Sequence, residues 1–206
     1  MKPEDFIPWE KYPELTRKRL SAFARLIREA REGAVRRHDP ASGDGPWGLG
    51  CSAHERTQFA IKEGSGKYDW LSVTQDPEKP LRFVFAIGRV PFRIYRGEPE
   101  EPPSRYLATS YVELHERQLA LDFGVAIPTD GILRIAVETD AIGSVSRISV
   151  VEIDEARCIT GIYAIPLEEA EGDSSIPLQS PPVDLAPPSI EPLPKTEEEK
   201  KRKSSE

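Results

Sequence analysis

The sequence predicts a single α+β domain in which a long basic N-terminal helix packs on a mainly antiparallel sheet built from hairpins. Apolar residues recur at helical spacing over residues 14–37, and two later stretches alternate like hairpin strands around short turns. Apolar periodicity then stops at Leu167. We therefore expect an N-terminal arm over residues 1–12, an α+β domain over 13–166 and a disordered Pro/Glu-rich tail over 167–206.

The tail differs from the rest of the chain in composition and charge. It has no aromatic residue and is rich in Pro, Ser and Glu, so it cannot bury enough apolar surface to offset its ordering entropy. Its 10 acidic and 5 basic residues carry −5 of the formal net charge of −7, which leaves −2 for residues 1–166. We interpret it as a spacer, with a docking peptide as the alternative.

Nothing in the composition indicates secretion or a membrane. The chain has two cysteines, no apolar signal-peptide core in "MKPEDFIPWEKY", and no apolar run near the ~20 residues that span a bilayer. We expect a cytoplasmic protein with reduced thiols and no membrane contact. The absence of Asn, and 17 Arg against 6 Lys in residues 1–166, indicate a bacterial origin.

The most clearly defined element is a helix over residues 14–37. Its apolar face repeats at helical spacing, and Pro13 suits a first turn. Eight Arg or Lys against three Glu give this segment a charge of +5, and its opposite face carries Lys18, Arg25, Arg28 and Arg36. A shorter helix over roughly 53–63 follows from a capping box of Ser52 and Glu55, although alternation around Phe59 leaves a strand open.

The stretch "FAIGRVPFRIYR" predicts a hairpin turning at Gly88 and Arg89, with Gly first as a type II′ turn requires. One face then pairs Ile87 with Val90, Phe85 with Phe92 and Phe83 with Ile94. The other face pairs Ala86 with Pro91, Val84 with Arg93 and Arg82 with Tyr95, and we expect it to look outward. Because Pro91 lacks an N–H, strand 90–96 is expected to be, or locally to act as, a sheet edge.

Three further elements complete the predicted order. A helix is expected near residues 106–121, and a second hairpin with the four-residue loop "DAIG" follows. That loop length pairs Val137 with Ser146, Ile135 with Ile148 and Leu133 with Val150. "ITGIYAIP" is the last strand.

The motifs that resemble known cofactor and metal sites lack the context those sites need. "GDGPWG" follows a helix rather than a strand, and "GSGK" lacks the remaining Walker residues. "HER" occurs twice, but Gln58 and Leu119 stand where a zincin has its second His. We expect no cofactor and no metal, and a non-enzyme is favoured over an enzyme.

The first functional hypothesis is a binding or regulatory module that contacts a protein or nucleic-acid partner. Its candidate contact residues are Arg25, Arg28 and Arg36 on the helix, and Arg82, Arg89, Arg93, Tyr95 and Arg96 around the hairpin. The alternative is that these arginines have only a structural role, and either lie beneath a helix or pair with Glu98, Glu100 and Glu101.

Two other hypotheses remain open. A metal-independent ribonuclease-like toxin, or another phosphate-ester enzyme, would use Arg82, Arg93 and Arg96 as electrostatic stabilisers with His54 or His115 as acid or base. The α-α-βββ-α order resembles that of small bacterial ribonuclease toxins in topology only. A structural subunit would instead form a homo-oligomer through edge strand 90–96.

Overall fold

The computed structural model describes residues 6–75, 83–122 and 131–167 of the chain. All of them belong to the first of two compact units, residues 1–173, and the second unit is residues 174–206. The predicted tail beyond Leu167 therefore lies outside the described residues and stays a prediction. Within the described ranges the predicted α+β class, with a long N-terminal helix and a mainly antiparallel sheet, is confirmed.

The described strands form one six-stranded sheet in chain order. They are β1 (Leu71–Gln75), β2 (Phe83–Ile87), β3 (Val90–Arg96), β4 (Gly131–Thr139), β5 (Val145–Asp154) and β6 (Ile159–Ala164). All neighbours are antiparallel except β3 and β4, which are parallel. Parallel neighbours need a crossover connection. The crossover contains η3 (Ser104–Tyr106) and α4 (Tyr111–Asp122).

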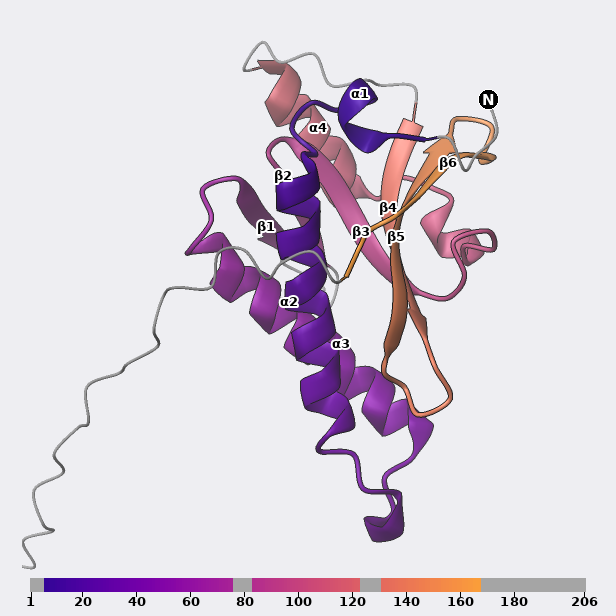
Figure 1. The fold of residues 1–206 in the computed structure, drawn as a ribbon. Helices are drawn as coiled ribbons and strands as arrows, with labels where there is room; N and C mark the ends of the chain where they lie inside the picture. Colours follow the sequence, from indigo (N-terminus) through magenta and orange to yellow (C-terminus); the bar gives the residue numbers. More distant parts are fainter. Residues whose placement is uncertain (1–5, 76–82, 123–130, 168–206) are drawn as a thin grey trace, which may run out of the picture. The chain divides into compact units, whose positions relative to one another are not determined.

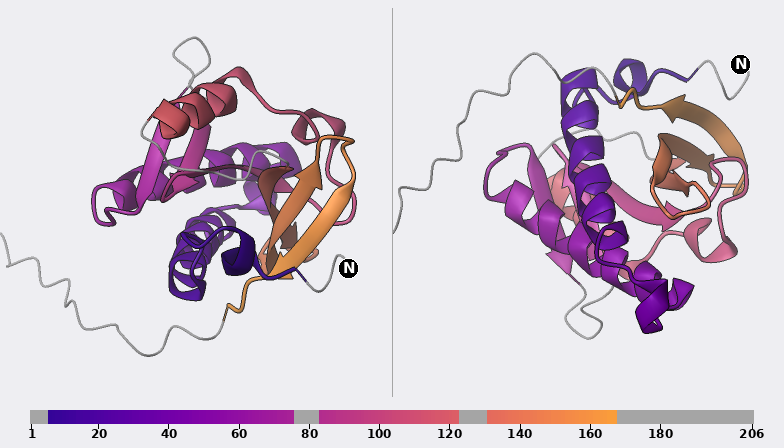
Figure 2. Two further views of the ribbon diagram at one scale, coloured as in Figure 1. Left: turned by 90° about the horizontal axis from the view of Figure 1, so that it is seen from above. Right: turned by 60° about the horizontal axis from the view of Figure 1, so that its bottom comes forward.

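Helices cover both faces of this sheet (Figures 1 and 2). On one face lie α2 (Arg17–Val35) and α3 (Pro46–Ser65), joined through η2 (Pro40–Ser42) and preceded by α1 (Pro8–Lys11). On the other face lies α4, packed on β2 and β3. The side chain of Thr16 caps α2 by accepting a hydrogen bond from the Arg19 N–H.

The second helix, α3, is longer than its predicted range of 53–63. It begins at Pro46, where a missing N–H costs nothing, with Gly45 as N-cap. The predicted capping box is wrong, because Ser52 lies inside the helix and its hydroxyl accepts a hydrogen bond from Nε of Arg56.

The first hairpin has the predicted register where its pairs are defined: Phe85 with Phe92, Ala86 with Pro91 and Ile87 with Val90. Phe85 and Phe92 stack at 5.5 Å, and Phe23 of α2 stacks on Phe85 at 4.4 Å. The face predicted to be apolar is therefore the core beneath α2.

Strand 90–96 is not an edge strand along its length, which corrects the first form of the prediction drawn from Pro91, but it acts locally as an edge at Val90 and Pro91, where β4 does not pair with it. β3 pairs with β2 on one side and, from Phe92 to Arg96, with β4 on the other. Pro91 precedes the first parallel pair, so its missing N–H leaves no gap in that ladder. The side of β3 that pairs with β4 is therefore not available for homotypic pairing through strand 90–96, and that pairing stays a prediction.

The second hairpin is offset by two residues from its predicted register. Val137 pairs with Ile148 and Ile135 with Val150, because a bulge at Glu138/Thr139 and a longer turn intervene. Asp140 closes that turn by accepting hydrogen bonds from the N–H groups of Ile142 and Ser144. A shift of two residues keeps every side chain on its predicted face.

Residues 6–12 pack on the core. Phe6 lies against Gly161 of β6, where a Cβ would approach its ring to 2.4 Å. The carboxylate of Glu152 on β5 accepts a hydrogen bond from the Tyr12 hydroxyl at 2.7 Å. It also forms an ion pair with Lys11 at 2.9 Å. Across the described ranges, no helix combines the length and apolar character needed to cross a bilayer.

We expect Gly88→Ala to lower the free energy of unfolding by about 1–3 kcal/mol. Gly88 has φ +63°, and an added Cβ would lie 2.4 Å from Oε2 of Glu14, which accepts the Arg89 N–H. The matched control is Gly50→Ala inside α3, where nothing lies within 4 Å. Urea unfolding should show the control stabilised by about 0.5–1 kcal/mol. Equal effects at both sites would contradict this account of the turn.

Candidate functional site

The sheet face that carries Arg93 and Tyr95 is covered rather than open, contrary to the prediction. Tyr95 is 2% exposed, and its hydroxyl donates to the carbonyls of Glu98 and Pro99. Arg93 lies 4.6 Å over the Tyr106 ring and donates to the carbonyls of Arg105 and Ala108. The crossover from β3 to β4 runs over this face, so neither residue offers a broad contact surface.

A buried ion pair fastens that crossover to the sheet. Arg134 of β4 is 0% exposed and binds both carboxylate oxygens of Glu113, which is 1% exposed on α4. The guanidinium also donates to the carbonyls of Tyr106 (2.8 Å) and Ala108 (3.0 Å). Burial lowers the pKa of Arg134, and the Glu113 charge opposes that shift. Arg93 lies 3.6 Å from the same carboxylate.

Glu113 also caps its own helix. Its carboxylate accepts the Ser110 N–H at 2.8 Å, and the Ser110 hydroxyl accepts the Glu113 N–H at 3.3 Å. This reciprocal pair is a capping box. The Ser-x-x-Glu spacing is the sequence signal that could have located this helix start. The helix begins at Tyr111 rather than at the predicted residue 106.

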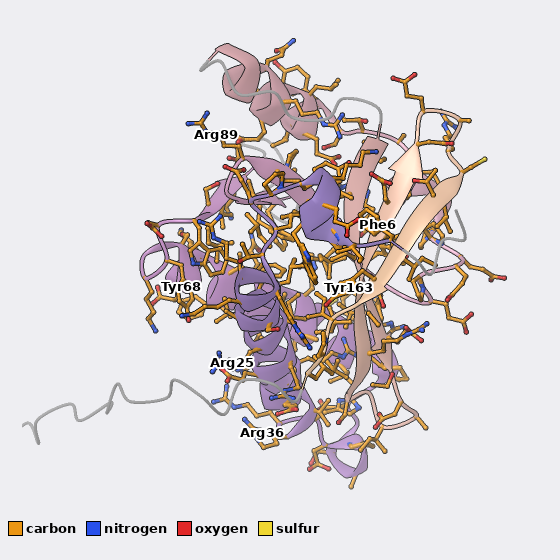
Figure 3. The ribbon with its side chains drawn as sticks, turned by 45° about the horizontal axis from the view of Figure 1, so that its top comes forward. Phe6, Arg25, Arg36, Tyr68, Arg89 and Tyr163 are labelled. Carbon is orange, nitrogen blue, oxygen red and sulfur yellow. The ribbon has the colours of Figure 1, made fainter. Side chains whose placement is uncertain are left out.

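The remaining predicted contact residues are not gathered in one place. Arg89 is exposed at the β2–β3 turn, far from Arg25 and Arg36 in Figure 3. Arg82 lies outside the described residues. Arg93 and Arg96 point to opposite faces of β3, because side chains alternate along a strand. The predicted combined surface therefore divides into separate parts.

On α2, the arginines have different surroundings. Arg28 is half-buried, donates to the carbonyl of Leu167 at 3.1 Å and lies 3.9 Å from Glu32. Arg25 is half-buried. Arg36 is exposed. A Cβ added at Gly33 would lie 3.9 Å from a guanidinium nitrogen of Arg36 and 3.9 Å from one of Arg56. Arg36 and Arg56, from consecutive helices, are thus a pair of cations that both approach Gly33, which the sequence did not reveal.

Beside this pair, a shallow groove of about 410 Å³ lies between α2 and α3. Ala30 and Ala60 form its small apolar floor, Glu55 and Arg56 border it, and Phe59 stands 65% exposed beside them. We call this surface the α2–α3 groove.

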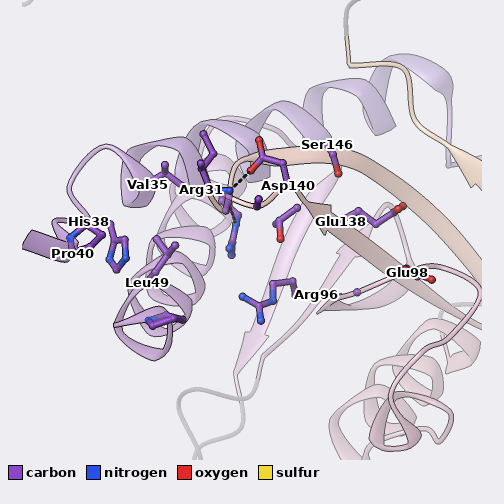
Figure 4. Close-up of a pocket in the computed structure, with 16 residues that line it drawn as sticks. Arg31, Val35, His38, Pro40, Leu49, Arg96, Glu98, Glu138, Asp140 and Ser146 are labelled. Atoms are coloured by element: carbon purple, nitrogen blue, oxygen red, sulfur yellow. Dashed lines mark hydrogen bonds between the residues drawn. The ribbon is translucent and has the colours of Figure 1, made fainter. Parts of the chain in front are cut away.

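Arg96 lines a larger cleft of about 810 Å³ at the C-terminal end of α2 (Figure 4). Its walls come from α2, the start of α3, the end of β3 and the β4–β5 turn. Arg31 and Arg96 point into this space from α2 and β3. We call it the Arg31–Arg96 cleft.

Arg31 is the residue that the sequence prediction missed. Its side chain is 6% exposed, and its Nε donates to the Gly143 carbonyl at 2.7 Å. Its Nη2 is buried without a hydrogen-bond partner among the described residues. Burial lowers the pKa of Arg31, the nearby charge of Arg96 lowers it further, and Asp140 opposes both effects.

The residues of the enzyme hypothesis do not converge. His54 is exposed on α3 beside the Phe83 ring, whereas His115 is exposed on α4 across the sheet. Neither histidine is among the residues that line the Arg31–Arg96 cleft. Among the described side chains, no group of three or more His, Cys, Asp or Glu is placed to hold a metal ion.

Comparisons with protein-family models, curated protein sequences and solved structures found no match to this chain.

We expect Glu113→Gln to cost about 3 kcal/mol of unfolding free energy, because it leaves a buried guanidinium without its counter-charge. Gln keeps the capping box, so helix capping does not account for the loss. Adding Arg134→Met should recover about half of the cost in chemical denaturation. A loss below about 1 kcal/mol for Glu113→Gln would contradict a role for the ion pair in holding the crossover.

Tyr95→Phe should cost about 1 kcal/mol at pH 7 through its lost hydrogen bonds. Burial, followed by the charges of Glu100 and Glu138, raises the pKa of Tyr95. The folded state thus favours the neutral phenol, and this advantage is complete below the ordinary pKa of about 10 and lost as pH rises further. Unfolding measured from pH 8 to 11 should show the difference between wild type and variant shrinking above about pH 10. A difference that grows would show that Tyr95 ionises more readily when folded.

Proposed function

We propose that this chain is a non-catalytic binding module that docks a protein partner in the α2–α3 groove. The observation that carries the proposal is Phe59, which stands 65% exposed beside a groove floored by Ala30 and Ala60. Exposed aromatic side chains and arginines are the residue types that concentrate binding energy at protein interfaces. Arg56 borders the groove, and Arg36 lies outside its lining but approaches Gly33 together with Arg56.

The charges around the groove favour a protein over a nucleic acid. Glu55 borders the groove, and Glu29 and Glu63 are exposed on the same two helices. A phosphate backbone would meet these carboxylates along its length, whereas a protein segment can place a single carboxylate on the Arg36–Arg56 pair. The occupant that fits is a segment presenting an apolar side chain next to one carboxylate.

The test compares binding by wild type, Phe59→Ser, and the double variant Arg36→Glu/Arg56→Glu. Arg89→Glu is the matched control, because Arg89 is exposed like Arg36 but lies at the β2–β3 turn. Proteins captured by the wild type from a lysate of the source cells are identified, purified and titrated against each variant by calorimetry. We expect the dissociation constant to rise at least about tenfold for both groove variants and to stay unchanged for Arg89→Glu.

Failure to capture a protein, or a protein that binds Phe59→Ser as tightly as wild type, would contradict the proposal. The same variants are titrated with duplex DNA and single-stranded RNA at two salt concentrations. Salt-dependent binding that the Phe59→Ser variant retains would assign the cationic surface to nucleic acid instead. Circular dichroism of each variant checks that the fold is intact.

A further inference from the structure

The Arg31–Arg96 cleft contains a guanidinium whose hydrogen-bonding capacity is incompletely used. Arginine has five N–H donors. Nε of Arg31 is satisfied by the Gly143 carbonyl, but its buried Nη2 has no partner within the described ranges. An unpaired buried polar atom carries a desolvation cost, and more so on a charged group. An acceptor entering the cleft would remove that cost.

Arg96 strengthens the case, because it brings a second cation to the same space. It is exposed, its charge acts on Arg31, and Figure 4 shows both side chains pointing into the cleft from different elements. Two like charges at one site repel each other unless a negative group lies between them. Planar guanidinium groups bind carboxylate and phosphate oxygens with two parallel hydrogen bonds.

The carboxylates at the rim do not fill that role. Glu138 pairs with Arg147, and Asp140 accepts the N–H groups of its own turn. His38 lies 3.7 Å from Asp44 rather than from either cleft arginine. Glu98 also lines the cleft but forms no ion pair with either arginine, and Asp140 acts on Arg31 through its charge without a hydrogen bond. Neither guanidinium therefore has an ion-pair partner among the described residues.

The remaining walls indicate what the anion is attached to. Val35, Leu49 and Pro46 line one side, and the volume of about 810 Å³ falls in the range of small-molecule sites. We propose that the Arg31–Arg96 cleft binds a small organic anion, whose carboxylate or phosphate bridges the two guanidinium groups while its apolar part lies against these three residues. The cleft shares no lining residue with the α2–α3 groove, so this proposal stands independently of the proposed function.

The probes are hexanoate and phenyl phosphate, with hexanol and inorganic phosphate as controls for the apolar and anionic parts. Each is titrated into the full chain while the Nε–H resonance of Arg31, assigned with Arg31→Lys, is followed by ¹H–¹⁵N NMR. We expect a saturable shift with hexanoate, phenyl phosphate or both, and which of them binds identifies the anionic group. Hexanol should cause none, and inorganic phosphate should bind at least about tenfold more weakly.

Arg96→Gln removes the exposed cation without disturbing the core, and we expect it to weaken binding of the responding probe at least about tenfold. Arg36→Gln is the matched control, because Arg36 is an exposed arginine at the C-cap of α2 outside the cleft, and it should bind like wild type. The proposal is overturned if neither organic anion gives a saturable shift, if Arg96→Gln binds as well as wild type, or if hexanol binds equally. Loss of the NMR fingerprint in Arg96→Gln would show instead that Arg96 is structural.

Discussion

The parallel pairing of β3 with β4 is the constraint on which the arrangement of charged groups depends. Two parallel neighbours cannot be joined by a tight turn, so the chain between them crosses one face of the sheet. That crossover covers Arg93 and Tyr95, and it places α4 opposite the α2–α3 pair. Among the predicted contact residues that the structure describes, the arginines that stay at least partly exposed away from the crossover lie along or at the end of α2, at the β2–β3 turn and at the last residue of β3.

The two sheet faces are held by different physical interactions. Beneath α2, stacked aromatic rings and aliphatic side chains form a continuous apolar core. Beneath the crossover, a smaller apolar cluster surrounds the pair of Arg134 and Glu113. Desolvating two charges costs free energy, and their mutual attraction offsets it only when the remaining donors are satisfied. Carbonyls of the crossover provide those acceptors, so the pair fixes where the crossover lies rather than simply adding stability.

Local patterns in the sequence predicted the local elements well. The 14–37 periodicity and the Gly88 turn depend on residues close in sequence, and both appear with their expected apolar faces, although the helix spans Arg17–Val35. The parallel pair depends on residues some forty positions apart and leaves no comparable periodic signal. Arg134 sits inside the apolar run "GILRIAVET", which gives no indication of Glu113 as its partner. The sequence could not distinguish Arg31 from the other cations of the helix, because Arg31 differs from them by its hydrogen bond to the β4–β5 turn, which exists only in the folded chain.

These placements make α2 the common element of both proposed binding surfaces, with the groove along its side and the cleft at its end. All of this depends on β3 lying inside the sheet. Residue-resolved amide hydrogen exchange tests that placement most directly. If β3 pairs with β4, the amides between Phe92 and Arg96 that face β4 are strongly protected. Rapid exchange at alternate amides of this strand, as at an exposed edge, would contradict the account and return Arg93 and Tyr95 to the accessible surface.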